Sequence, residues 1–214
     1  MLTFKEVYDN LYCYYGPQGW WPADTPIEMI VGSILVQHTN WRNAEKALQN
    51  IKDVLTAEAL DNMPLEELAY RIRPSGFYNI KAKRIKTFLD WFKKYQFQIE
   101  KIRHFDRDKL RKELLSIQGV GHETADVILL YVFDKSIFIA DAYARRIFHR
   151  FGYNIPKGYD AFRIDVEEAL SSSDVDLYNE YHALLVEHGK VHCKSDPICT
   201  GCPLSTYCRR LIHS

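Results

Sequence analysis

The chain has 214 residues, of which 47% are hydrophobic, so it can bury a sizeable core in one large domain or two small ones. Its 28 Lys and Arg balance its 28 Asp and Glu, which excludes a strongly basic protein that binds nucleic acid through overall charge. The N-terminus has no apolar signal segment and no long uncharged apolar run follows, which favours a soluble intracellular protein over a secreted or membrane protein.

The first part of the chain predicts short amphipathic helices. Apolar residues at helical spacing predict a helix over residues 3–14, in which Cys13 is expected to be buried. The loop Gly19-Trp20-Trp21-Pro22 follows, and its proline excludes a helix there. Thr25-Pro26-Ile27-Glu28 is a capping box with proline at the first helical position, so a helix begins here, and Asn40 is expected to cap the next one.

The middle of the chain predicts a long helix that carries several lysines and arginines. Two short helices are expected over residues 57–61 and 65–72. Residues 73–79, Arg-Pro-Ser-Gly-Phe-Tyr-Asn, then break the pattern before a helix over residues 80–96, whose basic residues are usually just solvated. An exposed Phe77 beside these cations is suited to wedge into a base stack.

A glycine hairpin, Gly119-Val120-Gly121, separates a helix expected over residues 106–117 from an apolar helix that follows. The two glycines permit a tight turn. The turn aims the unpaired N–H groups of the second helix outward, which suits a phosphate oxygen without any base-specific contact. Alternatively, a Gly-x-Gly sequence before a helix is only a loop.

An apolar run ends at a carboxylate after the hairpin. The run, residues 137–139, carries the only strand signal, so the fold is expected to be all-α. Asp141 opens a helix over residues 142–151, and an aspartate in that position is usually a helix cap, although it can also have a catalytic role. Further helices are expected over residues 159–170 and 174–187.

Four of the five cysteines lie in the C-terminal tail. The odd number and this crowding argue against a secreted disulfide scaffold. Four thiolates so close together repel one another unless a metal centre holds them, although zinc and disulfides remain alternatives. The four have the spacing C-x5-C-x2-C-x5-C and are Cys193, Cys199, Cys202 and Cys208.

The hairpin, the apolar helix and the A-D-x-x-x-R-R sequence together resemble the helix-hairpin-helix DNA glycosylase superfamily, whose fold is endonuclease III-like. The resemblance implies an all-α, two-lobed fold. One lobe is a six-helix barrel over residues 25–135 with the helix-hairpin-helix motif at about 106–133, and the other combines residues 1–24 and 136–214. The resemblance also implies that Asp141 is the catalytic carboxylate.

The tail is similar to the C-x6-C-x2-C-x5-C of endonuclease III-like glycosylases, which holds a [4Fe-4S] cluster. The resemblance therefore implies such a cluster on residues 193–208, and the shorter first gap keeps zinc as the alternative.

Three sequences resemble the small 3-methyladenine DNA glycosylase branch of this superfamily: W-W-P, Q-x-T-x-aromatic and R-P-S-G-F-Y-N-x-K-A-K-R. The resemblance implies a base pocket lined by Trp20, Trp21, Pro22 and Trp41. It also implies a DNA wedge formed by Gln37 and Phe77. The residues expected to hold the DNA backbone are Gly119, Val120, Gly121, Thr124, Arg145 and Lys83.

Bifunctional members of the superfamily carry a lysine two residues after the second hairpin glycine, and Glu123 stands there in this chain. A carboxylate cannot form a Schiff base, so we expect an enzyme without lyase activity. It would flip alkylated purines such as 3-methyladenine out of double-stranded DNA and hydrolyse the N-glycosidic bond. We expect a monomer, without a membrane partner, in the cytoplasm and nucleoid of a prokaryote.

Two other functions stay open. The first is a glycosylase for an oxidised or mismatched base. The second is a non-catalytic helix-hairpin-helix DNA-binding module, in which Asp141 only caps a helix.

Overall fold

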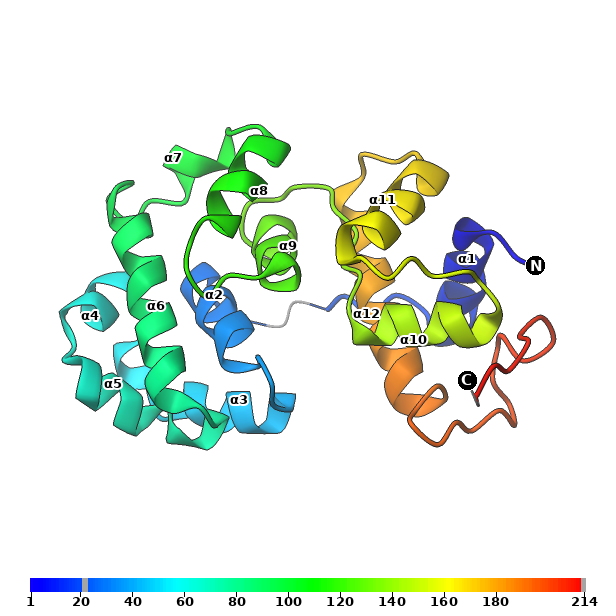
Figure 1. Ribbon diagram of the computed structural model, residues 1–214, viewed down its shortest axis with the longest axis horizontal. Coiled ribbons are helices and arrows are strands. Elements are labelled where there is room, and N and C mark those ends of the chain that lie inside the picture. The colour runs from blue at the N-terminus through cyan, green and yellow to red at the C-terminus, as the bar shows by residue number, and fades with distance from the viewer. Residues whose placement is uncertain (21–22, 213–214) are drawn as a thin grey trace. The chain divides into compact units, whose positions relative to one another are not determined.

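The computed structural model describes residues 1–20 and 23–212, which leaves Trp21, Pro22, His213 and Ser214 outside the description (Figure 1). The chain is 61% helical and has no β-strand within the described residues, which confirms the all-α prediction. Contacts between residues divide it into two compact units. Unit 1 consists of residues 1–20 and 136–214, and unit 2 of residues 21–135.

The described part of unit 2 is built from α-helices with two short 3-10 turns, and its first helices begin where the sequence predicts. The Thr25 side chain accepts a hydrogen bond from the Glu28 N–H at 3.2 Å, and the Asn40 side chain accepts one from the Asn43 N–H at 3.0 Å. The elements are α2 (Pro26–Leu35), α3 (Trp41–Gln49), η1 (Lys52–Val54), α4 (Ala57–Asn62), α5 (Leu65–Arg71), η2 (Arg73–Ser75), α6 (Tyr78–Lys93), α7 (Glu100–Arg103), α8 (Arg107–Leu115) and α9 (His122–Tyr131).

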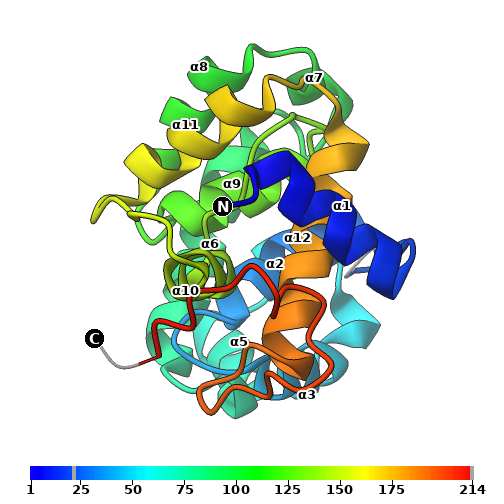
Figure 2. The ribbon, with the colours of Figure 1, turned by 90° about the vertical axis from the view of Figure 1, so that its right-hand side faces the viewer.

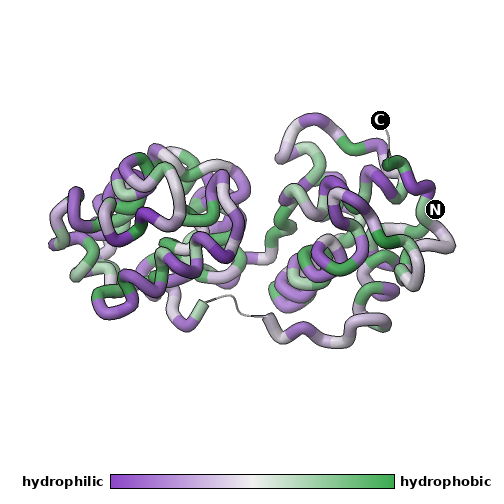
Figure 3. Tube along the Cα trace, turned by 90° about the horizontal axis from the view of Figure 1, so that it is seen from below, coloured by the Kyte–Doolittle hydropathy of each residue, from purple (hydrophilic) through white to green (hydrophobic). Residues whose placement is uncertain are grey.

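Two apolar helices form the centre of unit 2. Residues 29–35 of α2 are all buried, and α9 is buried on most sides. These helices pack against each other, and α8 packs on α9. The surrounding helices are amphipathic, so hydrophobic and hydrophilic stretches alternate along the trace (Figure 3). The long helix α6 begins at Tyr78, two residues earlier than expected, and Phe77 precedes it in a left-handed conformation with φ 47°.

Unit 1 contains α1 (Phe4–Tyr15), α10 (Ala142–Phe151), α11 (Tyr159–Leu170) and α12 (Val175–Val191). Helix α12 packs on both α1 and α10. Aromatic rings fill the core between them: Phe148 lies edge-on to Phe4 at 4.9 Å between ring centroids and to Phe162 at 5.9 Å. The Tyr181 hydroxyl donates to the Phe4 carbonyl at 2.6 Å, which satisfies the polar end of a buried ring.

The expectation that Cys13 is buried is wrong, because its thiol is exposed. Helix α1 buries Val7 and Leu11, which are four residues apart and share one face. Cys13 follows Leu11 by two residues and therefore lies on the opposite side of the helix.

The tail after α12 returns to the C-terminal end of α10 (Figure 2). The Arg209 N–H donates to the Phe151 carbonyl at 3.2 Å, and the Leu211 N–H donates to the Arg150 carbonyl at 3.1 Å. These bonds satisfy carbonyls that the end of a helix leaves without an intrahelical partner. Among the described helices, none has the length and apolar character needed to cross a membrane.

Candidate functional site

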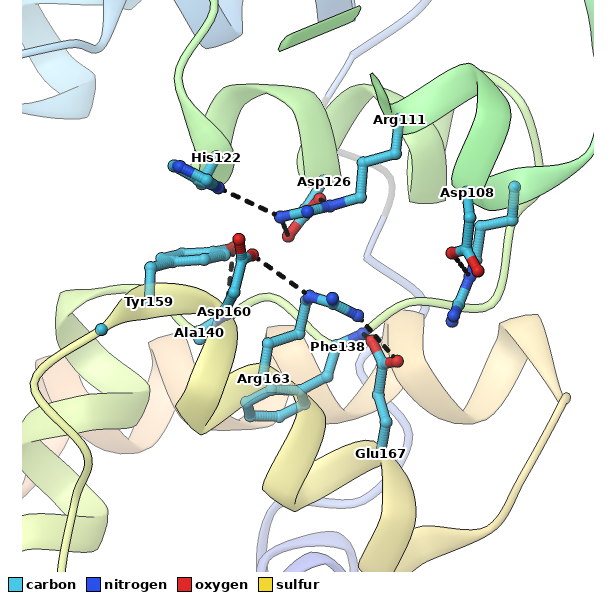
Figure 4. A network of polar contacts seen from close by, with 12 residues as sticks. Asp108, Arg111, His122, Asp126, Phe138, Ala140, Tyr159, Asp160, Arg163 and Glu167 are labelled. Carbon is cyan, nitrogen blue, oxygen red and sulfur yellow. Dashed lines mark hydrogen bonds and ion pairs between the residues drawn. The ribbon is translucent and has the colours of Figure 1, made fainter. Parts of the chain in front are cut away.

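A buried, extended segment leads into α10, and residues 137–139 in it are not a strand. The Phe138 N–H donates to the Glu167 carboxylate at 3.0 Å, and the Ala140 N–H donates to the Tyr159 hydroxyl at 3.3 Å (Figure 4). Both acceptors belong to α11, so side chains satisfy the backbone where a neighbouring strand would otherwise do so. Helix α11 therefore fixes the position at which α10 starts.

Asp141 is the N-cap of α10, as expected. Its Oδ1 accepts a hydrogen bond from the Ala144 N–H at 2.7 Å, and the residue is only 7% exposed. The second oxygen, Oδ2, lies 3.6 Å from Nε2 of His182. This separation is too long for a direct hydrogen bond, but it allows an ion pair when the imidazole is protonated. One oxygen thus serves the helix, while the other faces a second ionisable group.

His182 was not found by sequence reasoning. It lies on α12, is buried, and its ring centroid is 5.3 Å from that of Trp20. Trp20, His182 and Asp141 therefore form a cluster within unit 1. The signal that identifies such a residue is a histidine directly before an apolar run, here residues 183–186 of the same helix.

The tryptophans proposed for a base pocket belong to different parts of the chain. Trp20 is half-buried in unit 1, whereas Trp41 is the first residue of α3 in unit 2 and is 41% exposed. The other two residues of that proposal, Trp21 and Pro22, lie outside the described residues.

The two hairpin glycines have different roles. Gly119 has φ 96°, and a Cβ built there would lie 2.3 Å from Cγ of Arg84, so the turn requires glycine. Gly121 has extended angles, φ −89° and ψ 177°, and a Cβ there would meet nothing within 4 Å. It is the N-cap of α9 and makes no side-chain cap hydrogen bond, so no side chain of the N-cap residue competes for the first N–H groups of the helix.

Gln37, just after α2, points to this hairpin. Its side-chain amide donates to the Gly119 carbonyl at 3.1 Å and to the Thr124 hydroxyl at 2.9 Å. Its carbonyl oxygen accepts a hydrogen bond from the Arg84 guanidinium. Thr124 is buried, so its hydroxyl faces the inside of unit 2. Two side chains that we expected to contact DNA thus brace the hairpin from within.

The two helices of the hairpin are also joined by a buried ion pair. Nε of Arg111 on α8 donates to Oδ1 of Asp126 on α9 at 2.6 Å, and Nη2 reaches Oδ2 at 3.2 Å (Figure 4). The same guanidinium lies 3.4 Å from Nδ1 of His122, the first residue of α9. Breaking one partner of such a pair leaves a buried charge, so this contact holds the hairpin rigidly.

The other residues expected at the DNA backbone are placed as follows. Val120 is buried, and Lys83 is exposed on α6. Arg145 is half-buried: Nη2 donates to the Pro156 carbonyl at 2.6 Å, and the guanidinium lies over the Phe162 ring. Arg145 therefore braces the loop before α11.

The four tail cysteines line a single pocket in unit 1, together with His188 and His192 and with apolar side chains of α10. Burial, and more weakly the neighbouring thiols, raises the pKa of both Cys202 and Cys208. The Arg210 N–H donates to Sγ of Cys208 at 3.4 Å. Within the described residues, no three His, Cys, Asp or Glu side chains come close enough to hold a single metal ion.

Two kinds of metal centre hold four thiolates in different ways. Thiolates on one tetrahedral zinc, each at about 2.3 Å, must converge on a point. A four-iron cluster takes four thiolates that surround it from further apart. The pocket of this chain is lined by all four cysteines, as a centre held by four thiolates requires.

Residues 31–172 match the family described as the HhH-GPD superfamily base excision DNA repair protein. The match spans the hairpin and Asp141, so the chain belongs to this superfamily. It is a DNA glycosylase with the endonuclease III-like fold, and the resemblance stated from the sequence is confirmed.

Individual relatives agree with this assignment. The chain is 44% identical over 208 residues to a protein of Methanocaldococcus jannaschii that is provisionally named a DNA repair glycosylase, covering 95% of this chain and 94% of that protein. Among solved structures, the H. pylori 3-methyladenine DNA glycosylase bound to 1,N6-ethenoadenine has a TM-score of 0.78 and 26% identity, covering 88% of this chain and 98% of that one. A non-covalent endonuclease III–DNA complex has a TM-score of 0.77 and 25% identity, with 98% and 97% covered.

The different roles of the two glycines predict different effects of the same substitution. Gly119→Ala places a Cβ at positive φ against Arg84, and it should lower the free energy of unfolding by about 1–3 kcal/mol. Gly121→Ala should unfold like the unchanged protein but bind duplex DNA several-fold more weakly, because its methyl group narrows the approach to the amides of α9. Urea unfolding and fluorescence anisotropy with labelled duplex measure the two effects. Equal destabilisation by both substitutions would contradict this division.

Proposed function

We propose that this glycosylase is monofunctional and removes alkylated purines, such as 3-methyladenine, from double-stranded DNA. The observation that carries the proposal is the buried Asp141 carboxylate, with one oxygen on the α10 cap and the other beside His182 and near Trp20. A carboxylate so held is suited to a reaction at a sugar carbon.

Asp141 would act by electrostatics. As the N-glycosidic bond breaks, positive charge develops on the sugar, and a fixed carboxylate stabilises that oxocarbenium-like state. The cap bond from Ala144 keeps the carboxylate in one orientation, so little reorganisation is needed during the reaction. Oδ2 is the oxygen left to face the sugar or to orient the attacking water, and His182 is placed to position it.

The substrate class follows from the leaving group. A purine alkylated at a ring nitrogen is already cationic and leaves readily, so the enzyme needs a binding slot more than a strong acid. Stacking such a cation on indole contributes about 0.5–2 kcal/mol and favours it over the neutral base. The sequence resemblance assigns Trp20, Trp21, Pro22 and Trp41 to such a slot, and Trp20 lies beside His182 in unit 1. The similarity to a 3-methyladenine DNA glycosylase supports the assignment.

The lyase step is a separate question, because an endonuclease III structure is about as similar as the 3-methyladenine enzyme. What distinguishes this chain is Glu123, which stands in the first turn of α9 at the position where bifunctional members have a lysine. A carboxylate cannot attack the sugar to form a Schiff base. Water would therefore complete the reaction and leave an abasic site with an intact strand.

DNA would be held mainly through its phosphates. We assign this contact to the uncapped N–H groups at the start of α9 and to Lys83, with Phe77 as the residue that enters the base stack. Extruding a base costs a few kcal/mol, which contacts made by the wedge would offset. Gln37, Thr124 and Arg145 would support these contacts from within the protein.

The pocket in the tail would hold a [4Fe-4S] cluster on Cys193, Cys199, Cys202 and Cys208, which would brace the loop after α12. Lys194, Arg209 and Arg210, all exposed, lie next to these cysteines in sequence and would place positive charge near DNA phosphates.

The catalytic role of Asp141 predicts the effect of Asp141→Asn. The amide oxygen can still accept the Ala144 N–H, so the protein should fold and bind DNA. Release of 3-methyladenine from methylated duplex should fall by at least about 100-fold, because the charge is lost. Free base is measured by chromatography. Asp174, the N-cap of α12, is the matched control, and Asp174→Asn should release base at the unchanged rate. If both variants released base at the same rate, Asp141 would only cap α10 and would have no catalytic role.

The absence of the lysine predicts that DNA strands remain intact. Incubation with methylated duplex should give breaks only after alkali, and borohydride should trap no covalent complex, because no amine replaces Glu123. Gel electrophoresis of the labelled strand measures both. A borohydride-trapped complex would show that another amine attacks the sugar and that the enzyme is bifunctional.

The pocket predicts a cluster rather than a single ion. Purified protein should contain about four iron atoms and about four acid-labile sulfides per chain. Cys199→Ser should lower both, whereas Cys13→Ser should change neither, because Cys13 is exposed on α1. About one zinc per chain without sulfide would overturn the cluster assignment.

A further inference from the structure

One buried histidine in unit 1 has no part in the proposed reaction at Asp141. His188 lies near the end of α12, is 2% exposed and lines the pocket of the four tail cysteines. Its Nδ1 is 3.0 Å from the Tyr15 hydroxyl, and its Nε2 is 3.8 Å from Sγ of Cys202. Sequence reasoning identified Cys202 but not His188, because the tyrosine is 173 residues away in the chain and only the fold brings the three side chains together.

Contacts with α10 and with the tail fix the end of α12 that carries His188. The His188 carbonyl accepts a hydrogen bond from the Cys193 N–H at 2.9 Å. On α10, the Arg146 guanidinium donates from Nε to the Cys193 carbonyl at 2.8 Å and from Nη2 to the Gly189 carbonyl at 3.2 Å. The backbone of His188 therefore holds the first cysteine of the tail, while its ring reaches the third.

The two nitrogens of the His188 ring have different partners, which fixes the position of the proton. A buried histidine is often only a core residue whose nitrogens both find hydrogen-bond partners, but here one partner is a sulfur that we assign to the [4Fe-4S] cluster. A thiolate bound to iron has no proton and can only accept, so Nε2 must carry the proton. In a neutral imidazole Nδ1 is then the acceptor, and the Tyr15 hydroxyl donates to it. The hydroxyl thus selects the tautomer that donates to Cys202.

Two other sulfurs of the pocket also receive N–H groups. Nη1 of Arg150 lies 3.6 Å from Sγ of Cys193, and the Arg210 N–H donates to Sγ of Cys208 at 3.4 Å. These donors belong to α10 and to the tail itself. The His188 ring differs from them, because it connects a sulfur to the last residue of α1 through a second hydrogen bond. Hydrogen bonds to the sulfurs are among the factors that set the reduction potential of an iron–sulfur cluster.

We propose that Tyr15 and His188 form a relay of two hydrogen bonds that ends on the Cys202 thiolate and raises the reduction potential of the [4Fe-4S] cluster. A donated N–H stabilises negative charge on the sulfur, and the reduced cluster carries more of that charge than the oxidised one. Donors in this outer position also orient the ligand that they contact. Tyr15 is a positioning residue, because it acts through His188. The inference rests on the proposed function only in requiring that the four tail cysteines hold the cluster.

The test compares the midpoint potential of the cluster in the purified protein with that in variants, by spectroelectrochemical titration. His188→Leu removes the donor and should shift the potential to a lower value, whereas His188→Gln, whose side-chain amide can donate to the same sulfur, should restore most of the difference. Tyr15→Phe should give a smaller shift in the same direction, because the imidazole loses the partner that selects its tautomer. The double variant Tyr15→Phe with His188→Leu should match His188→Leu alone, since the tyrosine acts only through the histidine.

The neighbouring pair Tyr14 and His192 provides the matched control. The Tyr14 hydroxyl lies 3.5 Å from Nε2 of His192, but Nδ1 of that ring lies 2.8 Å from the Ile198 carbonyl rather than near a sulfur. Tyr14→Phe should therefore leave the potential unchanged. Resonance Raman spectroscopy gives a second readout: His188→Leu should raise the frequency of the Fe–S stretching bands, because a thiolate freed of its hydrogen bond binds iron more strongly, and Tyr14→Phe should not.

Iron and acid-labile sulfide are measured in every variant, so that potentials are compared only between proteins that hold the cluster. If His188→Leu loses the cluster or does not fold, Tyr15→Phe and Tyr14→Phe decide. A full iron and sulfide content with the same potential in the unchanged protein and in both tyrosine variants would overturn the relay and leave the cluster assignment intact. About one zinc per chain without sulfide would instead overturn the cluster that the proposed function assigns, and the relay with it.

Discussion

The region around the glycine hairpin in unit 2 depends on one side-chain amide, that of Gln37. A primary amide is the side-chain group that can donate two hydrogen bonds and also accept one at the same position. Here the amide donates to Gly119 and Thr124 and accepts from Arg84. A glutamate would lose both donors, and a lysine would lose the acceptor. Arg84 in turn fills the space where Gly119 lacks a Cβ. The end of α2, the hairpin turn and the long helix α6 therefore share one hydrogen-bond network.

A carboxylate that caps a helix and also takes part in catalysis is not a contradiction, because the two oxygens of Asp141 are used separately. Oδ1 is held by a backbone N–H, and Oδ2 faces His182. The cap bond removes rotational freedom that a catalytic group would otherwise lose during the reaction. The start of α10 is fixed in turn by α11, whose Glu167 and Tyr159 satisfy the backbone that leads to it. If Asp141 acts as proposed, the same short contacts serve both stability and catalysis.

Local signals in the sequence predicted much of this architecture, and contacts between distant segments were not predictable from it. Caps such as Asn40 and Asp141 and the glycine hairpin depend on neighbouring residues, so their positions follow from the sequence. The segment 137–139 reads as a strand because it is apolar, and only the side chains of α11 explain why it is not one. Likewise, a lysine on a helix is usually solvated, and nothing near Lys81 in sequence indicates that two carbonyls from other elements bury it.

The equal numbers of acidic and basic residues bear on how such a protein selects its site on DNA. Without a large net charge, long-range attraction to the polyanion is weak, so affinity must come from contacts at short range. In the proposed binding mode, the first N–H groups of α9 would contact phosphate without reading sequence, which suits an enzyme whose substrate is a damaged base in any context. What remains to distinguish one site from another is how easily a nucleotide leaves the stack and how well it binds once outside. The proposed wedge and the proposed aromatic slot for a cationic base would act on these two steps in turn, so discrimination would be applied twice although the first contact is indifferent to sequence.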